Sequence, residues 1–205
     1  MHQFGIQADE VKGALGAVNA VAAQFAVESS DIIAAVRRAG GTFSIASSNI
    51  TDANERLNQF LATFTSDRAT TREGANIIAT ALRTISARLQ RLGTQRALED
   101  LLGVQLRDLQ GNFVGIFEAI NRIGGALQNV NALSPQFAQV VEIVGGVRQL
   151  GVTIPLLTQA QTRFAALAVA QQGQTSLTRD AAISQDAVAL QFRRVREEFL
   201  QLIGE

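Results

Sequence analysis

The sequence predicts an all-α protein, a multi-helix domain with room for one small β-hairpin or irregular arm near residues 104–113. Apolar side chains recur every three or four residues along most of the chain, which is typical of helices with one buried face. Capping and turn residues divide this pattern into segments of about 10 to 25 residues. Hydrophobic residues make up 47% of the chain and charged residues only 18%, a balance too apolar for a disordered segment.

The first two helices are expected at residues 8–27 and 31–47. The first has an apolar stripe of helical period, formed by Val11, Leu15, Val18, Ala22 and Phe25. Ser29 and Ser30 precede the second helix and are good N-terminal caps. Gly40-Gly41 is a weak point inside the second helix, because glycine lowers helix stability.

A third helix begins at Thr51-Asp52, and its apolar residues are Leu57, Phe60, Leu61 and Phe64. A fourth is expected at residues 71–92 and ends at Gly93. Thr70 and Glu73 fit a capping box at its start, in which the Thr70 hydroxyl accepts from the Glu73 amide and the Glu73 carboxylate reaches back. On a helical wheel its apolar residues share an arc of about 140°. These residues are Ile77, Ile78, Ala81, Leu82, Ile85, Leu89 and Leu92.

The middle of the chain changes character after a short helix at about residues 95–102, which Gly103 ends. Gln110-Gly111-Asn112 is turn chemistry, so residues 104–113 are predicted to form the hairpin or arm. A further helix runs from Ile116 to near residue 131. One of its faces carries Ile116, Ile120, Ile123 and Leu127.

Three more helices complete the chain. Ser134-Pro135 is a strong helix start, with serine as the cap and proline at the first helical position, and this helix reaches Gly145-Gly146. The next covers 147–172 and is disturbed at Gly151 and Pro155. A long C-terminal helix is expected at about 175–203, with an apolar stripe of Val188, Phe192, Val195, Phe199 and Leu202. No internal repeat divides the chain, so residues 1–205 are predicted to form a single helical module.

Composition excludes several classes of function. Lys and Arg number 18 and Asp and Glu also 18, and this zero net charge argues against a dedicated nucleic-acid binder. Cysteine is absent and His2 is the only histidine, which removes the usual thiolate and imidazole chemistry. We therefore predict no enzyme activity and no catalytic, cofactor-binding or metal-binding residues. No run of about 20 apolar residues is present, so no transmembrane helix is predicted.

Four groups of residues leave more than one interpretation open. Arg83, Arg88, Arg91 and Arg96 form a basic run that could contact phosphate, but a solvated helix face is the simpler account. Gly124-Gly125 and Gly145-Gly146 lack the preceding strand of a phosphate-binding loop, so helix ends or close packing are favoured. The 188–202 stripe could be a coiled-coil seam between copies or could dock on its own domain. Seven phenylalanines are expected in the core: Phe4, Phe25, Phe43, Phe60, Phe64, Phe117 and Phe137.

The order of several segments resembles the conserved helical region of phage tail tape measure proteins. The strongest likeness is Thr71–Leu89, TREGANIIATALRTISARL, and it continues through the LGVQLRD and GNF of the arm. Val27–Arg38, the IVGGVRQ at 143–149 and the tail from Gly173 to Gly204 follow the same pattern. The resemblance covers about Phe4 to Gly204. Pro155 departs from it, because that part of the family pattern is usually uninterrupted helix.

The resemblance implies a structural protein of a tailed phage or tail-like particle, involved in tail assembly, tail length determination and DNA delivery. It implies location in the tail lumen of the virion, and in the host cytoplasm during assembly. The implied partners are tail tube subunits, tail assembly chaperones, tail tip proteins and other copies of the protein itself. Family members are much longer, so we expect this chain to be a fragment of such a protein.

Two other functions compete with this one. A membrane-active helical domain that perturbs the host envelope is suggested by the apolar excess and the glycine breaks. A wall-degrading enzyme is disfavoured, because no acid and nucleophile stand in a recognisable frame. As one unbroken helix the chain would span about 300 Å. Its breakers predict instead a folded module that does not measure length by itself.

Overall fold

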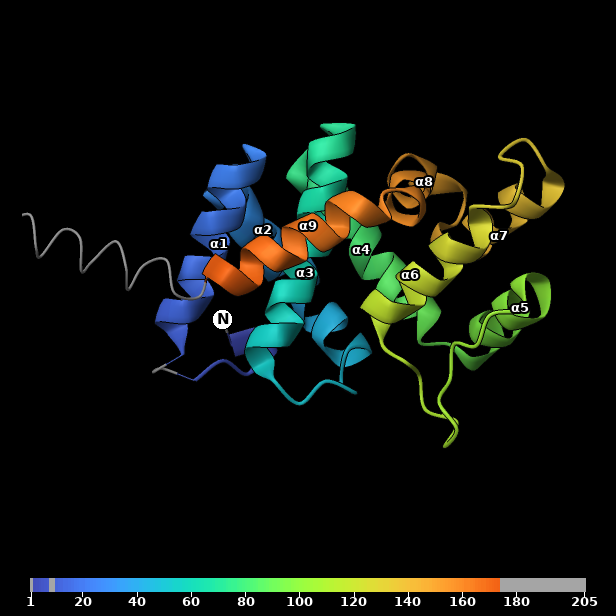
Figure 1. The fold of residues 1–205 in the computed structure, drawn as a ribbon, viewed down its shortest axis with the longest axis horizontal. Coiled ribbons are helices and arrows are strands. Elements are labelled where there is room, and N and C mark those ends of the chain that lie inside the picture. Colours follow the sequence, from blue (N-terminus) through green and yellow to red (C-terminus); the bar gives the residue numbers. More distant parts are fainter. Residues whose placement is uncertain (1, 8–9, 174–205) are drawn as a thin grey trace, which may run out of the picture.

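The computed structural model describes residues 2–7 and 10–173, and within them the protein is all-α. These residues form nine α-helices and two short 3₁₀ helices, with no β-strand among them. Figure 1 shows an elongated arrangement, with α1, α2, α3 and α9 towards one end and α5 and α7 towards the other. The predicted fold class is therefore confirmed.

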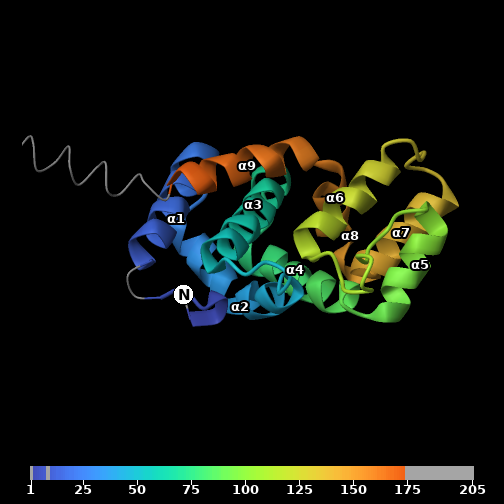
Figure 2. The same ribbon diagram turned by 60° about the horizontal axis from the view of Figure 1, so that its bottom comes forward.

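Four helices make the N-terminal half: α1 (Val11–Phe25), α2 (Ser29–Ala46), α3 (Ala53–Thr71) and α4 (Ala75–Leu89). A 3₁₀ turn at His2–Phe4 precedes them. Helix α3 begins at Asp52, whose carboxylate accepts from the amides of Asn54 and Glu55 at 2.8 and 3.4 Å. Helix α2 packs along α4, and α3 contacts helices of both halves. Figure 2 shows α3 near the centre of this half, between α9 above and α2 and α4 below.

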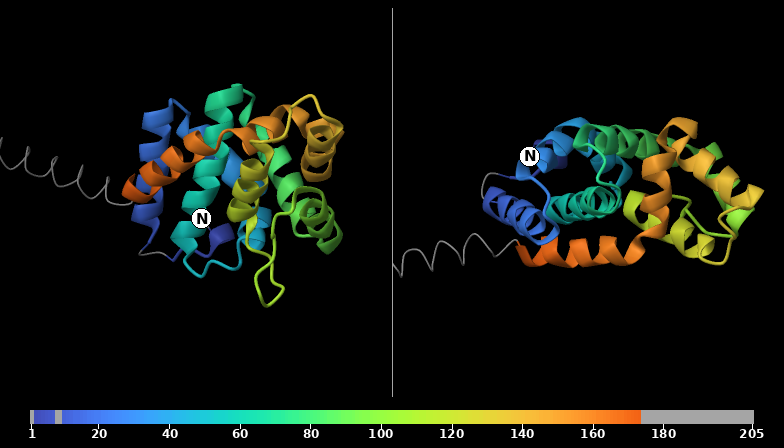
Figure 3. Two further views of the ribbon diagram at one scale, coloured as in Figure 1. Left: turned by 45° about the vertical axis from the view of Figure 1, so that its right-hand side comes forward. Right: turned by 90° about the horizontal axis from the view of Figure 1, so that it is seen from above.

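The second half contains α5 (Leu92–Leu102), α6 (Ile116–Leu127), α7 (Pro135–Gly145) and α8 (Leu150–Thr158), with a 3₁₀ turn at Val147–Gln149 before α8. Helix α9 (Ala160–Gly173) then returns to the first half and lies across α1 and α3. Figure 3 shows this crossing from two further directions. The last described helix therefore covers the first and third.

One contiguous core joins the two halves. It extends from Phe4 to Ala170, and the Phe60 ring meets those of Phe4, Phe43 and Phe64 at centroid distances of 5.7, 5.3 and 6.4 Å. A small separate cluster contains Ala62, Phe117 and Ala166. Of the seven phenylalanines predicted in the core, six are buried and Phe25 is only partly buried.

Several predicted helix ends are confirmed. The Ser134 hydroxyl accepts from the amide of Phe137 at 3.2 Å, and Pro135 is the first residue of α7. Gly103 ends α5 with a left-handed φ of 68°. Helix α2 continues through Gly40-Gly41 without a break. These ends were predictable because each depends on a few neighbouring residues.

The capping box at Thr70 and Glu73 is wrong. Helix α3 continues to Thr71, and the Thr70 and Thr71 hydroxyls donate to the carbonyls of Ser66 and Asp67 inside it. Arg72 then ends α3 with a φ of 57°, and α4 starts only at Ala75. The expected cap does not form because Thr70 lies inside α3, and the Glu73 amide donates instead to the Thr71 hydroxyl at 3.1 Å.

The apolar arc predicted for the fourth helix is also wider than the face that the structure buries. Ile77 is 53% exposed, and Leu92 is 47% exposed as the first residue of α5. The buried large residues are Ile78, Leu82, Ile85 and Leu89, whose spacing is four, three and four. Ile77 lies about 100° from Ile78 around the helix, outside this narrower stripe.

The predicted helix at 147–172 is three elements: the 3₁₀ turn, α8 and α9. The break that separates α8 from α9 lies at Gln159, whose ψ is 47°. Pro155 lies inside α8, and Gly151 does not interrupt it. Neither predicted breaker is therefore the position at which the chain turns.

The arm at 104–113 is hairpin-like but contains a single antiparallel bridge, between Arg107 and Phe113. The Asp108 amide donates to the Asn112 carbonyl at 2.8 Å. The predicted C-terminal helix at 175–203, with its 188–202 stripe, lies outside the described residues.

Candidate functional site

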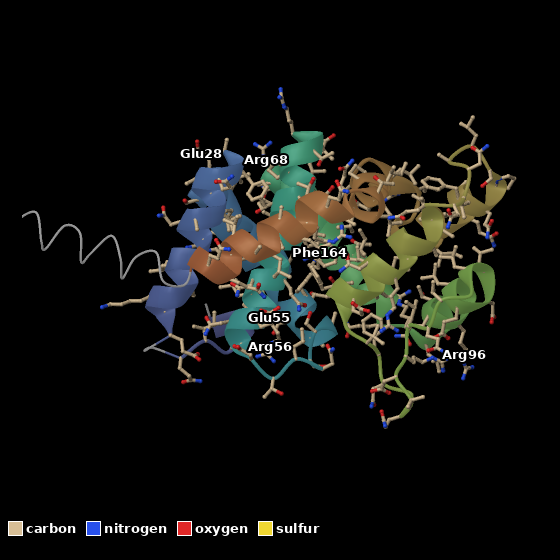
Figure 4. The ribbon with its side chains drawn as sticks, in the orientation of Figure 1. Glu28, Glu55, Arg56, Arg68, Arg96 and Phe164 are labelled. Atoms are coloured by element: carbon tan, nitrogen blue, oxygen red, sulfur yellow. The ribbon has the colours of Figure 1, made fainter. Side chains whose placement is uncertain are left out.

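Most of the basic run formed by Arg83, Arg88, Arg91 and Arg96 is exposed to solvent, as predicted. Arg83, Arg91 and Arg96 are exposed, and Figure 4 shows Arg96 on the outside of α5. Arg88 is different, because its guanidinium donates to the carbonyls of Glu142 and Ile143 at 3.0 Å each. Those carbonyls belong to the last turn of α7, and the Glu142 carbonyl also accepts from the Gly146 amide at 2.8 Å. Arg88 therefore caps α7, a role that the sequence did not indicate.

The two glycine pairs allow close packing, as predicted. A Cβ atom on Gly124 would lie 2.2 Å from the Leu157 carbonyl oxygen, and one on Gly145 would lie 1.8 Å from the Thr153 hydroxyl. Leu157 and Thr153 both belong to α8. These glycines thus let α8 approach α6 and α7 closely.

A buried arginine is the main polar feature that the sequence analysis missed. Arg163 of α9 is 0% exposed, and its guanidinium donates to the side-chain oxygen of Asn121 and to the backbone carbonyl of Leu156. These contacts join α9 to α6 and α8. The cation also lies 6.0 Å from the centre of the Phe117 ring.

A buried carboxyl group lies in the field of this arginine. Asp67 of α3 is 1% exposed, and neither of its oxygens has a hydrogen-bond partner. Burial raises the pKa of Asp67 from 3.8 to about 8, although the positive charge of Arg163 opposes the rise. Burial lowers the pKa of Arg163 to about 10, and Asp67 opposes that change. At neutral pH the carboxyl is therefore mostly protonated while the guanidinium keeps its charge.

A strongly shifted carboxyl pKa is common at functional sites. Here, however, both side chains are enclosed between helices, so a substrate cannot reach them unless a helix moves. The two groups therefore affect the stability of the fold, because a desolvated acid in α3 lies within the electrostatic field of a desolvated base in α9. We treat this buried Asp67–Arg163 centre as a conformational element.

The isolation of Arg163 in the sequence is the signal that could have revealed it. It is the only charged residue between Arg148 and Arg179. A lone charge in a long uncharged helical segment is more easily explained by a specific buried role than by a solvated face. Asp67 also has a signal, because it lies seven residues after Phe60 and three after Phe64, on the apolar side of its helix.

A surface cavity of about 590 Å³ lies where the ends of α2 and α4 meet the arm, lined among others by Asn49, Gln90 and Asp108. The Asp108 carboxylate accepts from the amides of Asn112 and Gln110, and these bonds, the Asn112 amide first, lower its pKa. It is thus committed to holding the arm. Among the described residues, no three His, Cys, Asp or Glu side chains gather as metal ligands.

No single described helix has the length and apolar character to cross a membrane. Taken together, Pro135–Gly145 and Val147–Thr158 have sufficient length and apolarity, but a bend of 92° separates them. Their inward residues are part of the core, among them Val140, Val144 and Leu156.

Comparison with known proteins identifies the family. The chain matches the family of phage-related minor tail proteins over residues 1–146, which is more than two thirds of its length. It has no significant match among curated proteins or among solved structures. The matched region ends at Gly146, the residue that follows α7. The chain belongs to the phage-related minor tail protein family.

Proposed function

We propose that this chain is a structural module of a phage tail tape measure protein, with a role in tail assembly, tail length determination and DNA delivery. The supporting observation is that the family match at 1–146 covers α1 to α7. The resemblance of Thr71–Leu89 to tape measure proteins adds the finer assignment. The tail lumen is the corresponding location.

The folded shape limits how such a module contributes to length. A ruler works when residues map onto distance, and a helix advances about 1.5 Å per residue. The longest described helix, α3, has 19 residues, which corresponds to about 28 Å. The chain then reverses and packs against itself. We therefore assign the module to assembly, and length measurement to extended parts of a longer protein.

We assign contacts with tail proteins to the surfaces around two exposed leucines. Leu109, in the arm, is fully exposed, and Leu133, between α6 and α7, is 93% exposed. The arm is stiffened by the Glu99–Arg107 ion pair and by the Asp108 hydrogen bonds. Preorganised apolar side chains are efficient anchors, because little entropy is lost on binding. Tube subunits, assembly chaperones, tail tip proteins and further copies of the chain are the proposed partners.

The test uses a phage that encodes this module and negative-stain microscopy of its tails. Leu82→Asp places a charge in the core at a residue that is 1% exposed, whereas Arg83→Ala changes the exposed neighbour. We expect Leu82→Asp to prevent tail assembly and Arg83→Ala to give normal tails.

Deletions of helical segments outside the module provide the matched comparison. We expect them to shorten tails by about 1.5 Å per residue. Normal, infectious tails from Leu82→Asp would contradict the assembly role. Uniformly shorter tails from that variant would contradict the division between module and ruler.

A membrane-active domain is the second candidate, and the bent pair of α7 and α8 is the observation that favours it. Liposome leakage distinguishes the two functions. We expect no leakage at neutral or mildly acidic pH, because the inward faces of both helices are part of the core. Dose-dependent leakage under either condition would favour the membrane function.

A further inference from the structure

Helix α9 is attached to the module differently from the other helices. It begins after the break at Gln159, crosses α1 and α3, and lies beyond residue 146, where the family match ends. Figure 1 shows it on the outside of α1 and α3. Four observations indicate that this attachment is reversible.

First, apart from Arg163, the side chains that α9 buries are small. Its buried residues are Arg163, Ala166, Ala170 and Gly173. Helix α4, by contrast, buries Ile78, Leu82, Ile85 and Leu89. Because hydrophobic stabilisation scales with buried apolar area, α9 gains much less from docking than α4 does.

Second, the face of α3 that lies under α9 is polar. Glu55 accepts from Gln171 of α9 at 3.0 Å and from Gln59 at 3.1 Å, and Ala62 follows on the same side. At about 100° per residue, these positions lie opposite the apolar face that contains Phe60 and Leu61. Figure 4 shows Glu55 on α3 close to α9. A face of this composition is compatible with water when α9 leaves.

Third, α9 contributes little to the main core. Ala166 belongs to the small separate cluster with Ala62 and Phe117, while Ala170 reaches the main core. Phe164 is 50% exposed, and its ring lies edge-on to Phe117 at 5.9 Å. Loss of these contacts leaves the Phe60 cluster of the main core intact.

Fourth, docking of α9 removes a charged group from water. Arg163 enters the interior with α9, where its charge interacts with the buried carboxyl of Asp67 in α3, which has no hydrogen-bond partner. Burial of such groups is costly, so undocking returns hydration energy that offsets part of the lost packing.

We propose that α9 is a detachable strap, which hinges at Gln159 and undocks from α1 and α3 as a unit while α1 to α7 stay folded. Undocking exposes the surfaces of α1 and α3 that α9 covers and lets α9 move away from the module. The strap does not depend on the role proposed in the phage tail.

Hydrogen exchange of the full chain, followed by mass spectrometry, tests the strap without any substitution. We expect α9 amides to exchange at least about 100-fold faster than those of α2 and α4, after correction for intrinsic rates. This opening should be insensitive to low urea concentrations, because it exposes little surface. Exchange of α9 and α4 at the same corrected rate, through one global opening, would overturn the proposal.

A substitution at Gly173 tests the docked contact directly. A Cβ atom there would lie 2.6 Å from the Ala20 Cβ and 2.8 Å from the Gly16 carbonyl oxygen. We expect Gly173→Ala to speed exchange in α9 by about tenfold and to leave α4 unchanged. Gly125→Ala is the matched control, since nothing lies within 4 Å of the added atom. If Gly173→Ala reduces protection in α4 as much as in α9, the helix is part of the core and is not a strap.

Discussion

Replacement of Asp67 by asparagine should change how the stability of this protein depends on pH. The folded state raises the pKa of Asp67 from 3.8 to about 8, chiefly because the carboxyl is buried. Its contribution to stability is therefore complete below pH 3.8 and is lost as the pH rises towards 8. Between these limits the folded state holds one proton that the unfolded state has released.

The size of the effect follows from the linkage relation. One bound proton corresponds to about 1.4 kcal/mol per pH unit, or on the order of 5 kcal/mol between pH 4 and pH 8. The free energy of unfolding of a domain is only about 5–15 kcal/mol. Asparagine is nearly isosteric with protonated aspartic acid and has no ionisation to suppress. We therefore expect Asp67→Asn to be more stable than the wild type near pH 8.

Urea unfolding at a series of pH values provides the assay, followed by circular dichroism because the chain has no Trp or Tyr. The free energy of unfolding of Asp67→Asn minus that of the wild type should rise by about 1.4 kcal/mol per unit from pH 5 to pH 7 and less steeply towards pH 8. The difference cancels the contributions of other carboxyl groups. A difference that stays constant over this range would show that Asp67 is ionised in the folded state, and the account of its burial would be wrong.

Four further predictions concern other parts of the chain. Leu82→Asp should lower the free energy of unfolding by several kcal/mol and unfold the protein, while Arg83→Ala should be tolerated. Thermal melts will compare the two variants, and a larger loss of stability from the arginine change would refute the solvated-face assignment. Asp108→Asn should destabilise the arm at pH values above the usual carboxyl pKa, because hydrogen bonds lower the pKa of Asp108 in the folded state. The effect should disappear as the pH falls through that lowered pKa, and hydrogen-exchange rates of the arm amides will measure it. The chain should not bind random duplex DNA at physiological salt, since its net charge is zero; salt-sensitive submicromolar binding in fluorescence anisotropy would contradict this. It should sediment as a monomer at micromolar concentration; a wild-type oligomer that Phe192→Glu converts to a folded monomer would identify the 188–202 stripe as an interface.

The sequence by itself determined the features that depend on neighbouring residues. Ser134 and Pro135 start α7 because capping needs only the next few amides. Gly103 ends α5, and residues 104–113 form the arm, for equally local reasons. The all-α class followed from the period of the apolar residues, which does not depend on how the helices are arranged.

Only the tertiary structure decided which polar residues are buried. Helix α3 has an ordinary apolar face at Phe60 and Leu61, and its opposite face at Glu55 and Ala62 is typical of a solvated surface. That second face is covered because α9, far along the chain, crosses it, and Arg163 is buried by the same packing. The role of Arg88 as the cap of α7 likewise depends on an approach between distant segments. Local periodicity indicates which face of a helix prefers the core, but coverage of the other face depends on long-range packing.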